Sequence, residues 1–282
     1  VKPFTVLAAL ESGNFQPDSL IDTSPGYVRV ANKIINDPNN YGVLDVAGVL
    51  RKSSQVGTTK IALALNPDDT RRLFKRMGFG EPVGSGFPGE TLGNLPAHRS
   101  WPEVTQAAFG YGYGLSVSSL QLARAYAILA NNGYRKEVSL VAIDSEPESI
   151  SVVDEGLART VRGMLHGASG EQGTGKRAMI EGYSVGGKTG TARKTNTGGG
   201  YDENRHISVF AGLSPIEQPR LVTVVVIDEP NGDRYSGGLV AAPVFSEVTG
   251  NALRLLQVTP DQLDANRTVA SLLRAPRKQG DS

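Results

Sequence analysis

Apolar residues in the first half of the chain recur at the three- and four-residue spacing that is typical of helices. The stretch "KPFTVLAALESG" has Pro3 near its start and Gly13 as a stop, which predicts a short, mostly buried helix. Helical patterns in "VLDVAGVLRKS" and "TTKIALAL" flank the polar "KSSQVG", so two helices should meet at a polar turn. Asn66 and Pro67 then open a capped helix that Gly78 ends.

The second half of the chain moves from helical patterns to strand patterns. A strong helix is predicted in "LSVSSLQLARAYAILANNG" and another in "VDEGLARTVRGMLHG". Three strands follow in "YSVGGKTGTARK", "HISVFAGLS" and "RLVTVVVIDE". The connection 215–219 is short enough for a hairpin, so the last two strands should pair antiparallel. A final helix in "LVAAPVFSEVTGNALRLL" completes a predicted α+β fold, an antiparallel sheet flanked by helices.

Three stretches have no strong periodicity. Residues 79–101 are dense in glycine and proline and predict a long irregular connection, a kind of loop that is often functional. The stretch "YVRVANKII" fits a strand or the edge of a loop. Residues 259–282 are polar, so we expect a disordered tail after one domain that spans 1–258.

Composition and charge exclude several classes of function. The 29 basic and 28 acidic residues give a net charge of +1, so no nucleic-acid partner is expected. The absence of cysteine excludes disulfides, thiolate metal sites and a cysteine nucleophile. Because His98, His166 and His206 have no ligand spacing, we expect no metal site and no cofactor. No apolar run approaches the roughly 18 residues of a membrane helix.

The strand pattern "SVGGKTGTARK" combines glycine, lysine and threonine in an unusual way. Glycine weakens a strand, so Gly186, Gly187 and Gly190 suggest that something approaches the backbone closely. Lys188 offers a positive charge, Thr189 a hydroxyl donor and Gly190 an open strand edge, which suits a carboxylate ligand. K-T-G alone is a weak motif, and the alternative is an ordinary twisted strand with a solvated lysine.

Two other motifs strengthen this interpretation. Lys2 lies in the first turn of a helix, where a serine three residues earlier would share its face, and Ser53 opens "SSQ". The order S-x-x-K, S-x-N and K-T-G resembles that of the penicillin-recognising serine enzymes. With "NYGVLDVAGVLRKSS", "GFPGE", "YGYGLSVSSLQLARAYAILANNG" and "VIDEP", the chain resembles the transpeptidase domain of a division-specific class B penicillin-binding protein, the FtsI type or penicillin-binding protein 3.

The resemblance, which spans about residues 1–258, implies a penicillin-binding protein and serine β-lactamase-like fold. It implies a serine D,D-transpeptidase that cross-links peptidoglycan stem peptides ending in D-Ala-D-Ala at the division septum, through an acyl-enzyme, and that β-lactams acylate and inhibit. It further implies a periplasmic domain of a bitopic inner-membrane protein, with the anchor outside this sequence, and divisome partners that include a septal glycosyltransferase.

The resemblance also implies roles for individual residues. Lys2 would act as the base, Ser53 would relay a proton, and Lys188 would help to hold the substrate carboxylate. Burial and a nearby second cation would keep Lys2 neutral. The implied substrate contacts are Gln55, Thr189, Gly190, Thr191, Tyr111, Tyr113, Arg193 and Tyr201.

The chain departs from the family pattern at two places. The nucleophilic serine would fall two positions before Val1, outside this sequence, so we expect an N-terminally incomplete chain. Gln55 stands where the family usually has asparagine, and its extra methylene would move the amide by about 1.5 Å. Such a displacement can change the substrate or β-lactam preference.

Simpler interpretations and other functions remain open at this point. Lys2 could be a surface lysine at a helix end, and Ser53 could only cap the following helix. A serine β-lactamase would need a group that activates water, for which Glu90 is the one candidate. A penicillin sensor or divisome scaffold would bind without turnover. Asp228 and Glu229 are interpreted as the end of a strand.

Overall fold

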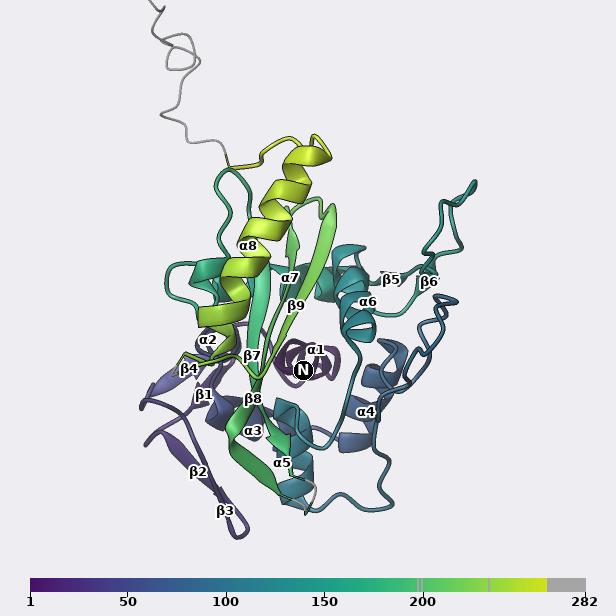
Figure 1. Cartoon of the computed structure of the whole chain (residues 1–282). Helices are drawn as coiled ribbons and strands as arrows, with labels where there is room; N and C mark the ends of the chain where they lie inside the picture. Colours follow the sequence, from purple (N-terminus) through teal and green to yellow (C-terminus); the bar gives the residue numbers. More distant parts are fainter. Residues whose placement is uncertain (197, 199, 233, 263–282) are drawn as a thin grey trace, which may run out of the picture.

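The computed structural model describes residues 1–196, 198, 200–232 and 234–262. Helices dominate up to residue 178, an antiparallel sheet follows, and a long helix closes the described fold (Figure 1). The predicted α+β class with helices around an antiparallel sheet is confirmed. The helices are α1 (Lys2–Glu11), α2 (Val46–Lys52), α3 (Gln55–Ala64), α4 (Pro67–Arg76), α5 (Glu103–Tyr111), α6 (Ser119–Ala130), α7 (Glu155–Ser169), the 3₁₀ helix η1 (Lys176–Ala178) and α8 (Gly237–Leu255).

The main sheet has the strand order β7-β8-β9 and is antiparallel throughout. Its strands are β7 (Gly186–Thr195), β8 (Tyr201–Ser214) and β9 (Leu221–Asp228). β8 and β9 form the predicted hairpin, in register from Ile207 opposite Asp228 to Ser214 opposite Leu221. Because β7 pairs only with β8, one edge of β7 stays open along the K-T-G motif.

Three short antiparallel pairs lie outside this sheet. They are β1 (Leu20–Asp22) with β4 (Val43–Asp45), β2 (Tyr27–Val30) with β3 (Lys33–Asn36), and β5 (Tyr134–Arg135) with β6 (Ile150–Ser151). The stretch "YVRVANKII" is therefore a tight hairpin, and the first residues of "VLDVAGVLRKS" form a strand before the predicted helix begins. The segment between β5 and β6 projects from the body (Figure 1).

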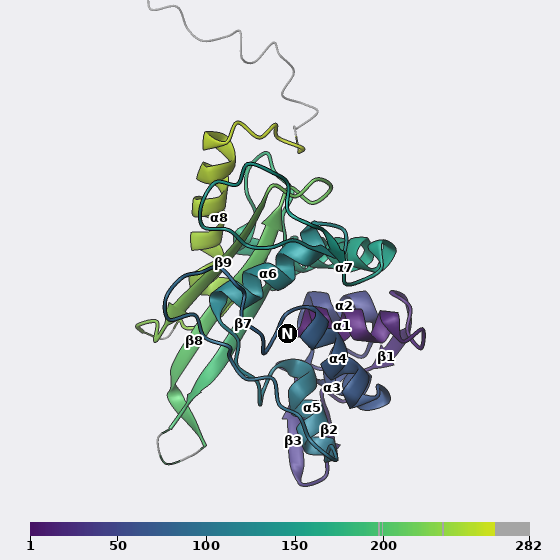
Figure 2. The same ribbon diagram turned by 90° about the vertical axis from the view of Figure 1, so that its right-hand side faces the viewer.

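The two faces of the main sheet are covered by different helices (Figure 2). α8 covers one face, where Phe245 packs on Phe210 of β8 with ring centroids 4.7 Å apart. α6 and α7 cover the other face and join the larger hydrophobic core, which includes Ala211 and Leu213 of β8. The sheet is thus fixed from both sides, which holds the open edge of β7 in place.

α1 lies at the centre of the larger core. Its eight residues from Pro3 to Leu10 are buried, which confirms the predicted buried helix. Phe4 anchors it by edge-to-face contacts with the rings of Phe79 at 5.1 Å and Tyr126 at 5.7 Å. A helix that is apolar all round must be buried, and here its N-terminus, with Lys2, is directed to one end of the core.

The connection 79–101 contains no helix or strand, as its composition predicts. Of the predicted tail, residues up to 262 still contact the body: the Asp261 carboxylate accepts a hydrogen bond from the Ser184 amide at 2.8 Å, and the Gln262 amide donates to Gly182 at 3.0 Å. The rest of that tail, 263–282, lies outside the described residues.

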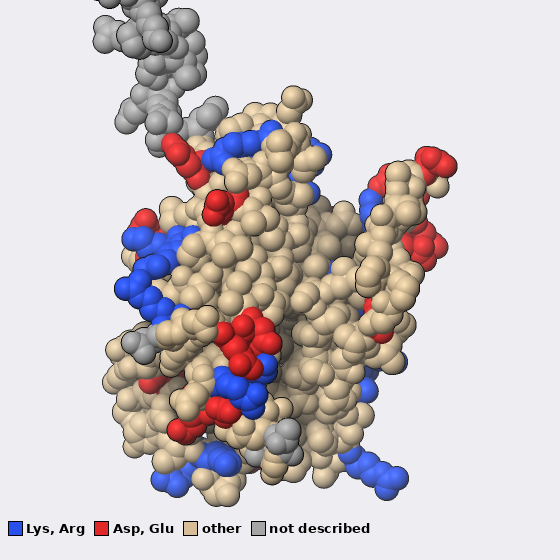
Figure 3. All heavy atoms as spheres, in the orientation of Figure 1, with Lys and Arg blue, Asp and Glu red and all other residues tan. Residues whose placement is uncertain are grey.

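No helix in the described part of the chain is long and apolar enough to span a bilayer. Among the side chains coloured by charge in Figure 3, acidic and basic groups are interspersed and do not form one large patch of either sign. The surface shown there therefore carries no strong electrostatic field of one sign.

Candidate active site

Lys2 enters the site from the first turn of α1. Pro3 occupies the start of the helix, where its missing amide hydrogen costs nothing, and Phe4 ties the turn to the core. The Lys2 ammonium nitrogen Nζ lies 2.5 Å from the Ser53 carbonyl oxygen and 3.0 Å from Ser53 Oγ. Lys2 is therefore not a solvated lysine at a helix end.

Ser53 lies at the junction of α2 and α3, which only Ser53 and Ser54 separate. It is the C-cap of α2 and adopts a left-handed conformation, with φ 57° and ψ 32°. The cap of the following helix is Ser54, whose Oγ accepts a hydrogen bond from the Gly57 amide at 2.8 Å. Because Ser54 takes over the capping, the Ser53 hydroxyl is free to contact Lys2.

The K-T-G motif lies on the open edge of β7, at residues 188–190. Lys188 is buried, and its Nζ donates to the Thr189 carbonyl at 3.0 Å and to Thr189 Oγ1 at 3.2 Å. The Thr189 hydroxyl also shares a 2.9 Å hydrogen bond with Thr174. Thr191 Oγ1 accepts a hydrogen bond from the Gly237 amide at the start of α8, 3.1 Å away. Thr189 and Thr191 are thus held by neighbouring segments, whereas the hydrogen bonds of Lys188 stay within β7.

The three glycines of β7 have different surroundings. A Cβ atom at Gly186 would lie 2.4 Å from Ile216 Cδ1, and one at Gly187 would lie 2.5 Å from the Phe210 ring. At Gly190 the nearest atom would be Val209 Cβ at 3.6 Å, an ordinary contact. The idea that all three glycines admit a ligand is therefore wrong: core side chains approach the first two, and only Gly190 borders open space.

A cleft of about 900 Å³ joins the ends of α1 and α5, the α2–α3 junction and the edge of β7. Nine of the residues predicted from sequence line it: Lys2, Ser53, Gln55, Tyr111, Tyr113, Lys188, Thr189, Gly190 and Thr191. Their positions in the chain span most of its length, so the fold brings them together. Arg193 and Tyr201 are not among the lining residues.

Tyrosine rings form one rim of this cleft. Tyr113 contacts Tyr111 at 5.7 Å and Tyr201 at 5.0 Å between ring centroids, both edge to face. Tyr201, the first residue of β8, therefore contacts the rim by packing against Tyr113. Arg193 is exposed further along β7, opposite His206. Partial burial raises the pKa of both Tyr111 and Tyr201, so these rings remain neutral at physiological pH.

The two lysines of the cleft are electrostatically unusual. Burial lowers the pKa of Lys2 from 10.5 to about 8, although the charge of Asp37 opposes this shift. Burial also lowers the pKa of Lys188 well below its ordinary value, and the charge of Lys2 adds to the effect. Burial thus brings the pKa of Lys2 close enough to neutral pH for part of it to be a neutral amine.

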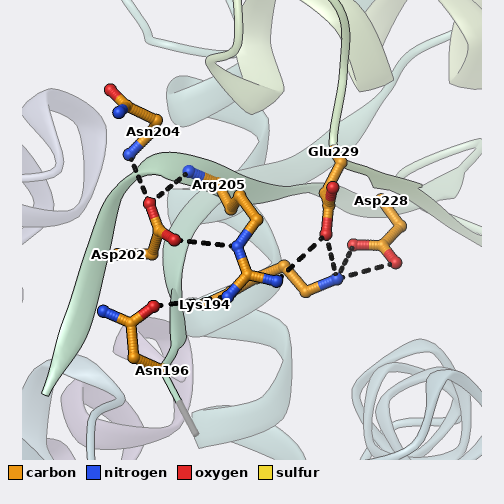
Figure 4. A network of polar contacts seen from close by, with 7 residues as sticks. All are labelled: Lys194, Asn196, Asp202, Asn204, Arg205, Asp228 and Glu229. Carbon is orange, nitrogen blue, oxygen red and sulfur yellow. Dashed lines mark hydrogen bonds and ion pairs between the residues drawn. The ribbon is translucent and has the colours of Figure 1, made fainter. Parts of the chain in front are cut away.

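The other carboxylates considered from sequence are occupied elsewhere. Glu90 Oε2 accepts a hydrogen bond from the Gly84 amide at 3.2 Å, and its other oxygen accepts from Val83, within its own loop. Asp228 and Glu229 both bind Lys194 Nζ at the end of β9, at 3.0 Å and 2.6 Å. They belong to a network that also contains Arg205, Asp202, Asn196 and Asn204 (Figure 4). Glu90, Asp228 and Glu229 do not line the cleft.

Several lining residues were not anticipated. Asp37 contacts Ser54 and the start of α3, yet the sequence suggested only a turn at "NDP". Thr174, Tyr41 and the cations Lys52, Lys176 and Arg177 also line the cleft. No local pattern identifies them, because their neighbours in the cleft come from distant segments. Asp37 lies 17 to 19 residues before its hydrogen-bond partners, so no local signal indicated its place in the cleft.

A lysine hydrogen-bonded to a serine, a K-T-G strand edge and a buried second lysine in one cleft define a penicillin-recognising serine enzyme. The family model for the penicillin binding protein transpeptidase domain matches residues 1–250. The chain belongs to this family, and the resemblance to class B transpeptidase domains is confirmed.

Relatives agree over nearly the whole chain. It is 39% identical over 260 residues to the probable peptidoglycan D,D-transpeptidase PenA of Neisseria flavescens, covering 92% of this chain and 64% of the relative. It is 38% identical over 263 residues to peptidoglycan D,D-transpeptidase FtsI of Escherichia coli K12, covering 93% and 44%. The apo transpeptidase domain of Burkholderia pseudomallei penicillin-binding protein 3 superposes with a TM-score of 0.88 at 40% identity, covering 93% of this chain and 80% of that structure.

Proposed function

We propose that this chain is the catalytic domain of a serine-type peptidoglycan D,D-transpeptidase. The observation that carries the proposal is the 3.0 Å contact between Lys2 Nζ and Ser53 Oγ in a cleft that Lys188 also lines. The chain spans about half to two thirds of the relatives named above, so the activity of the whole protein is inferred from this domain.

The first half of the reaction acylates a serine that precedes Lys2 by three residues. Neutral Lys2 takes the proton of that hydroxyl as its oxygen attacks the carbonyl carbon between the two D-alanines. A neutral amine has two protons, enough for both contacts with Ser53, and its lone pair stays available. The tetrahedral intermediate collapses as the C–N bond breaks. Ser53 relays the proton to the leaving D-alanine amine, which departs.

Substrate binding uses the open edge of β7. Lys188, Thr189 and Thr191 hold the terminal carboxylate, and Gly190 lets the peptide lie along the strand. The backbone amides of Thr191 and of the serine stabilise the oxyanion. Gln55 donates to a substrate amide, while Tyr111, Tyr113, Tyr201 and Arg193 border the bound peptide.

The second half of the reaction transfers the acyl group. The amine of a second stem peptide attacks the ester carbon, loses a proton to the Lys2 and Ser53 pair, and the serine oxygen leaves with a proton. One peptide bond is thereby exchanged for another. A β-lactam acylates the same serine, because its ring amide occupies the position of the D-Ala-D-Ala bond.

The FtsI relative also suggests a biological setting. We place the domain in the periplasm as part of a bitopic inner-membrane protein that acts at the division septum. Its partners there would be divisome proteins, including a septal glycosyltransferase. The match to relatives named FtsI and PenA supports this setting.

A serine β-lactamase needs a carboxylate or similar group that activates water in the cleft. Among the described residues that line the cleft, Asp37 is the only carboxylate, and three hydrogen bonds already occupy it. This arrangement favours a long-lived acyl-enzyme that an amine, rather than water, resolves.

The test uses the full-length protein, a labelled stem pentapeptide and a D-amino acid as acceptor. We expect an exchanged peptide product, which Lys2→Met abolishes and Lys60→Met retains. Lys60 is a matched control, because its Nζ also donates to a backbone carbonyl, that of Asp22 at 2.6 Å, outside the cleft. Rapid hydrolysis of a β-lactam would indicate a β-lactamase instead. Binding without any product would indicate a scaffold or sensor.

A further inference from the structure

Asp37 follows β3 at the edge of the cleft and is half-buried. Asp37 carries the only carboxylate among the described residues that line the cleft. The basic side chains of that lining are Lys2, Lys52, Lys176, Arg177 and Lys188. Because it is the one carboxylate among five basic side chains, its charge affects the protonation of its neighbours.

The Asp37 carboxylate binds the first turn of α3. Oδ2 accepts a hydrogen bond from Ser54 Oγ at 2.5 Å, and Oδ1 accepts from the amides of Gln55 at 2.6 Å and Val56 at 3.2 Å. Ser54 is fully buried, and its Oγ also accepts a hydrogen bond from the Gly57 amide in the first turn of α3. An anion at a helix N-terminus is stabilised by the helix dipole and by the free amides. Asp37 therefore holds the N-terminus of α3, although it does not belong to that helix.

This contact determines the position of Ser53. A left-handed backbone is strained for a residue other than glycine, so Ser53 keeps this conformation because both neighbouring helices hold it. On the α2 side, the amides of Ser53 and Ser54 donate to Leu50 at 3.1 Å and Val49 at 3.0 Å. On the α3 side, Asp37 supplies the fixed point. In this conformation the carbonyl and the hydroxyl of Ser53 both accept hydrogen bonds from Lys2 Nζ, at 2.5 Å and 3.0 Å.

We propose that Asp37 is a positioning residue of the transpeptidase: its carboxylate holds the α2–α3 junction so that Ser53 faces Lys2, and it supplies the negative charge of the cleft. The inference rests on the proposed function. The charge of Asp37 raises the pKa of Lys2 against the larger effect of burial. The other titratable groups that line the cleft with Lys2 are the basic side chains of Lys188, Lys52, Lys176 and Arg177 and the tyrosines Tyr41, Tyr111 and Tyr113.

The test is the pH profile of acylation of the full-length protein by benzylpenicillin, from pH 6 to 10. Asp37→Asn keeps the size of the side chain and removes its charge. We expect the midpoint of the rising limb to move to lower pH by about half a unit or more, since the opposing charge near Lys2 is gone. We expect the plateau rate to fall roughly tenfold, since Ser53 is held less firmly.

The matched control is Asp45→Asn at the start of α2. Asp45 Oδ1 accepts a hydrogen bond from the Gly48 amide at 2.5 Å, so it also caps a helix, and it does not line the cleft. This variant should lower Tm and leave the acylation midpoint unchanged. Asp37→Glu separates the two roles, because it keeps the charge and displaces the carboxylate. It should keep the midpoint and lower the plateau.

The outcomes are distinct. A wild-type protein that benzylpenicillin does not acylate would overturn the proposed function together with this inference. A wild-type protein that is acylated, with an Asp37→Asn profile equal to that of wild type or of Asp45→Asn, would overturn the inference alone. If Asp37→Asn does not fold, the Asp37→Glu profile decides: an unchanged midpoint with a lower plateau supports the inference, and a wild-type profile overturns it.

Discussion

Gly110 sets the distance between α5 and α3, the helices that carry Tyr111 and Gln55 to the cleft. A Cβ atom at position 110 would lie 2.3 Å from the Ala62 Cβ. Two carbon atoms prefer about 3.5–4.0 Å, so Gly110→Ala requires the helices to separate by more than about 1 Å. The Gly110 carbonyl also accepts a hydrogen bond from Thr5 Oγ1 at 2.5 Å, which ties the movement to α1.

The expected cost follows from this overlap. Overpacking a core costs about 1–3 kcal/mol, of which the better helix propensity of alanine returns about 0.5–1 kcal/mol. For a domain of this size, the net loss of up to about 2.5 kcal/mol lowers Tm by up to roughly 10 °C. A displacement of about 1 Å in the site can slow the reaction by as much as about 100-fold, so acylation should slow by at least roughly tenfold.

Differential scanning calorimetry and fluorescent-penicillin labelling of the full-length protein measure the two effects. Gly163→Ala on α7 is the control, because a Cβ there meets nothing within 4 Å. It should raise Tm slightly and leave the labelling rate unchanged. The reasoning is refuted if Gly110→Ala melts at the wild-type temperature and labels at the wild-type rate, or if both variants lose Tm equally.

Three further predictions concern the cleft. The acylation rate should rise roughly tenfold from pH 7 to 9, because the neutral fraction of Lys2, with a pKa of about 8, rises from about one tenth to about nine tenths; a flat stopped-flow profile would contradict this. Between pH 8 and 10.5, Lys2 is mostly neutral in the folded protein and protonated in the unfolded chain, so unfolding takes up a proton. The free energy of unfolding, and with it the midpoint urea concentration, should therefore rise with pH in that window, and should rise less in Lys2→Met. Tyr113→Ala removes the contacts of this ring with Tyr111 and Tyr201, worth about 0.5–1.5 kcal/mol each, and so loosens the rim of the cleft. In a concentration series, initial ligand binding should weaken up to roughly tenfold, and the limiting acylation rate should stay unchanged. A fall in the limiting rate instead would place Tyr113 in the chemistry.

Local patterns predicted the elements that their own residues determine. The apolar run of α1 and the strand patterns of β8 and β9 correspond to the structure, because each records which side chains are buried. The motif order predicted Lys2, Ser53 and Lys188 as site residues, and the fold brings the three to one cleft. Asp37 was missed because its partners lie 17 to 19 residues further on, beyond any periodic signal. The glycines at 186 and 187 were misinterpreted because the rings and methyls that require them come from distant segments.

A serine preceding Lys2 should form a stable acyl-enzyme in this cleft. This can be measured by the intact mass of the full-length protein before and after incubation with benzylpenicillin. We expect a gain of one drug mass that persists for many minutes and maps to the peptide containing that serine. No adduct on a protein confirmed to contain the serine, or an adduct that hydrolyses within seconds, would contradict it.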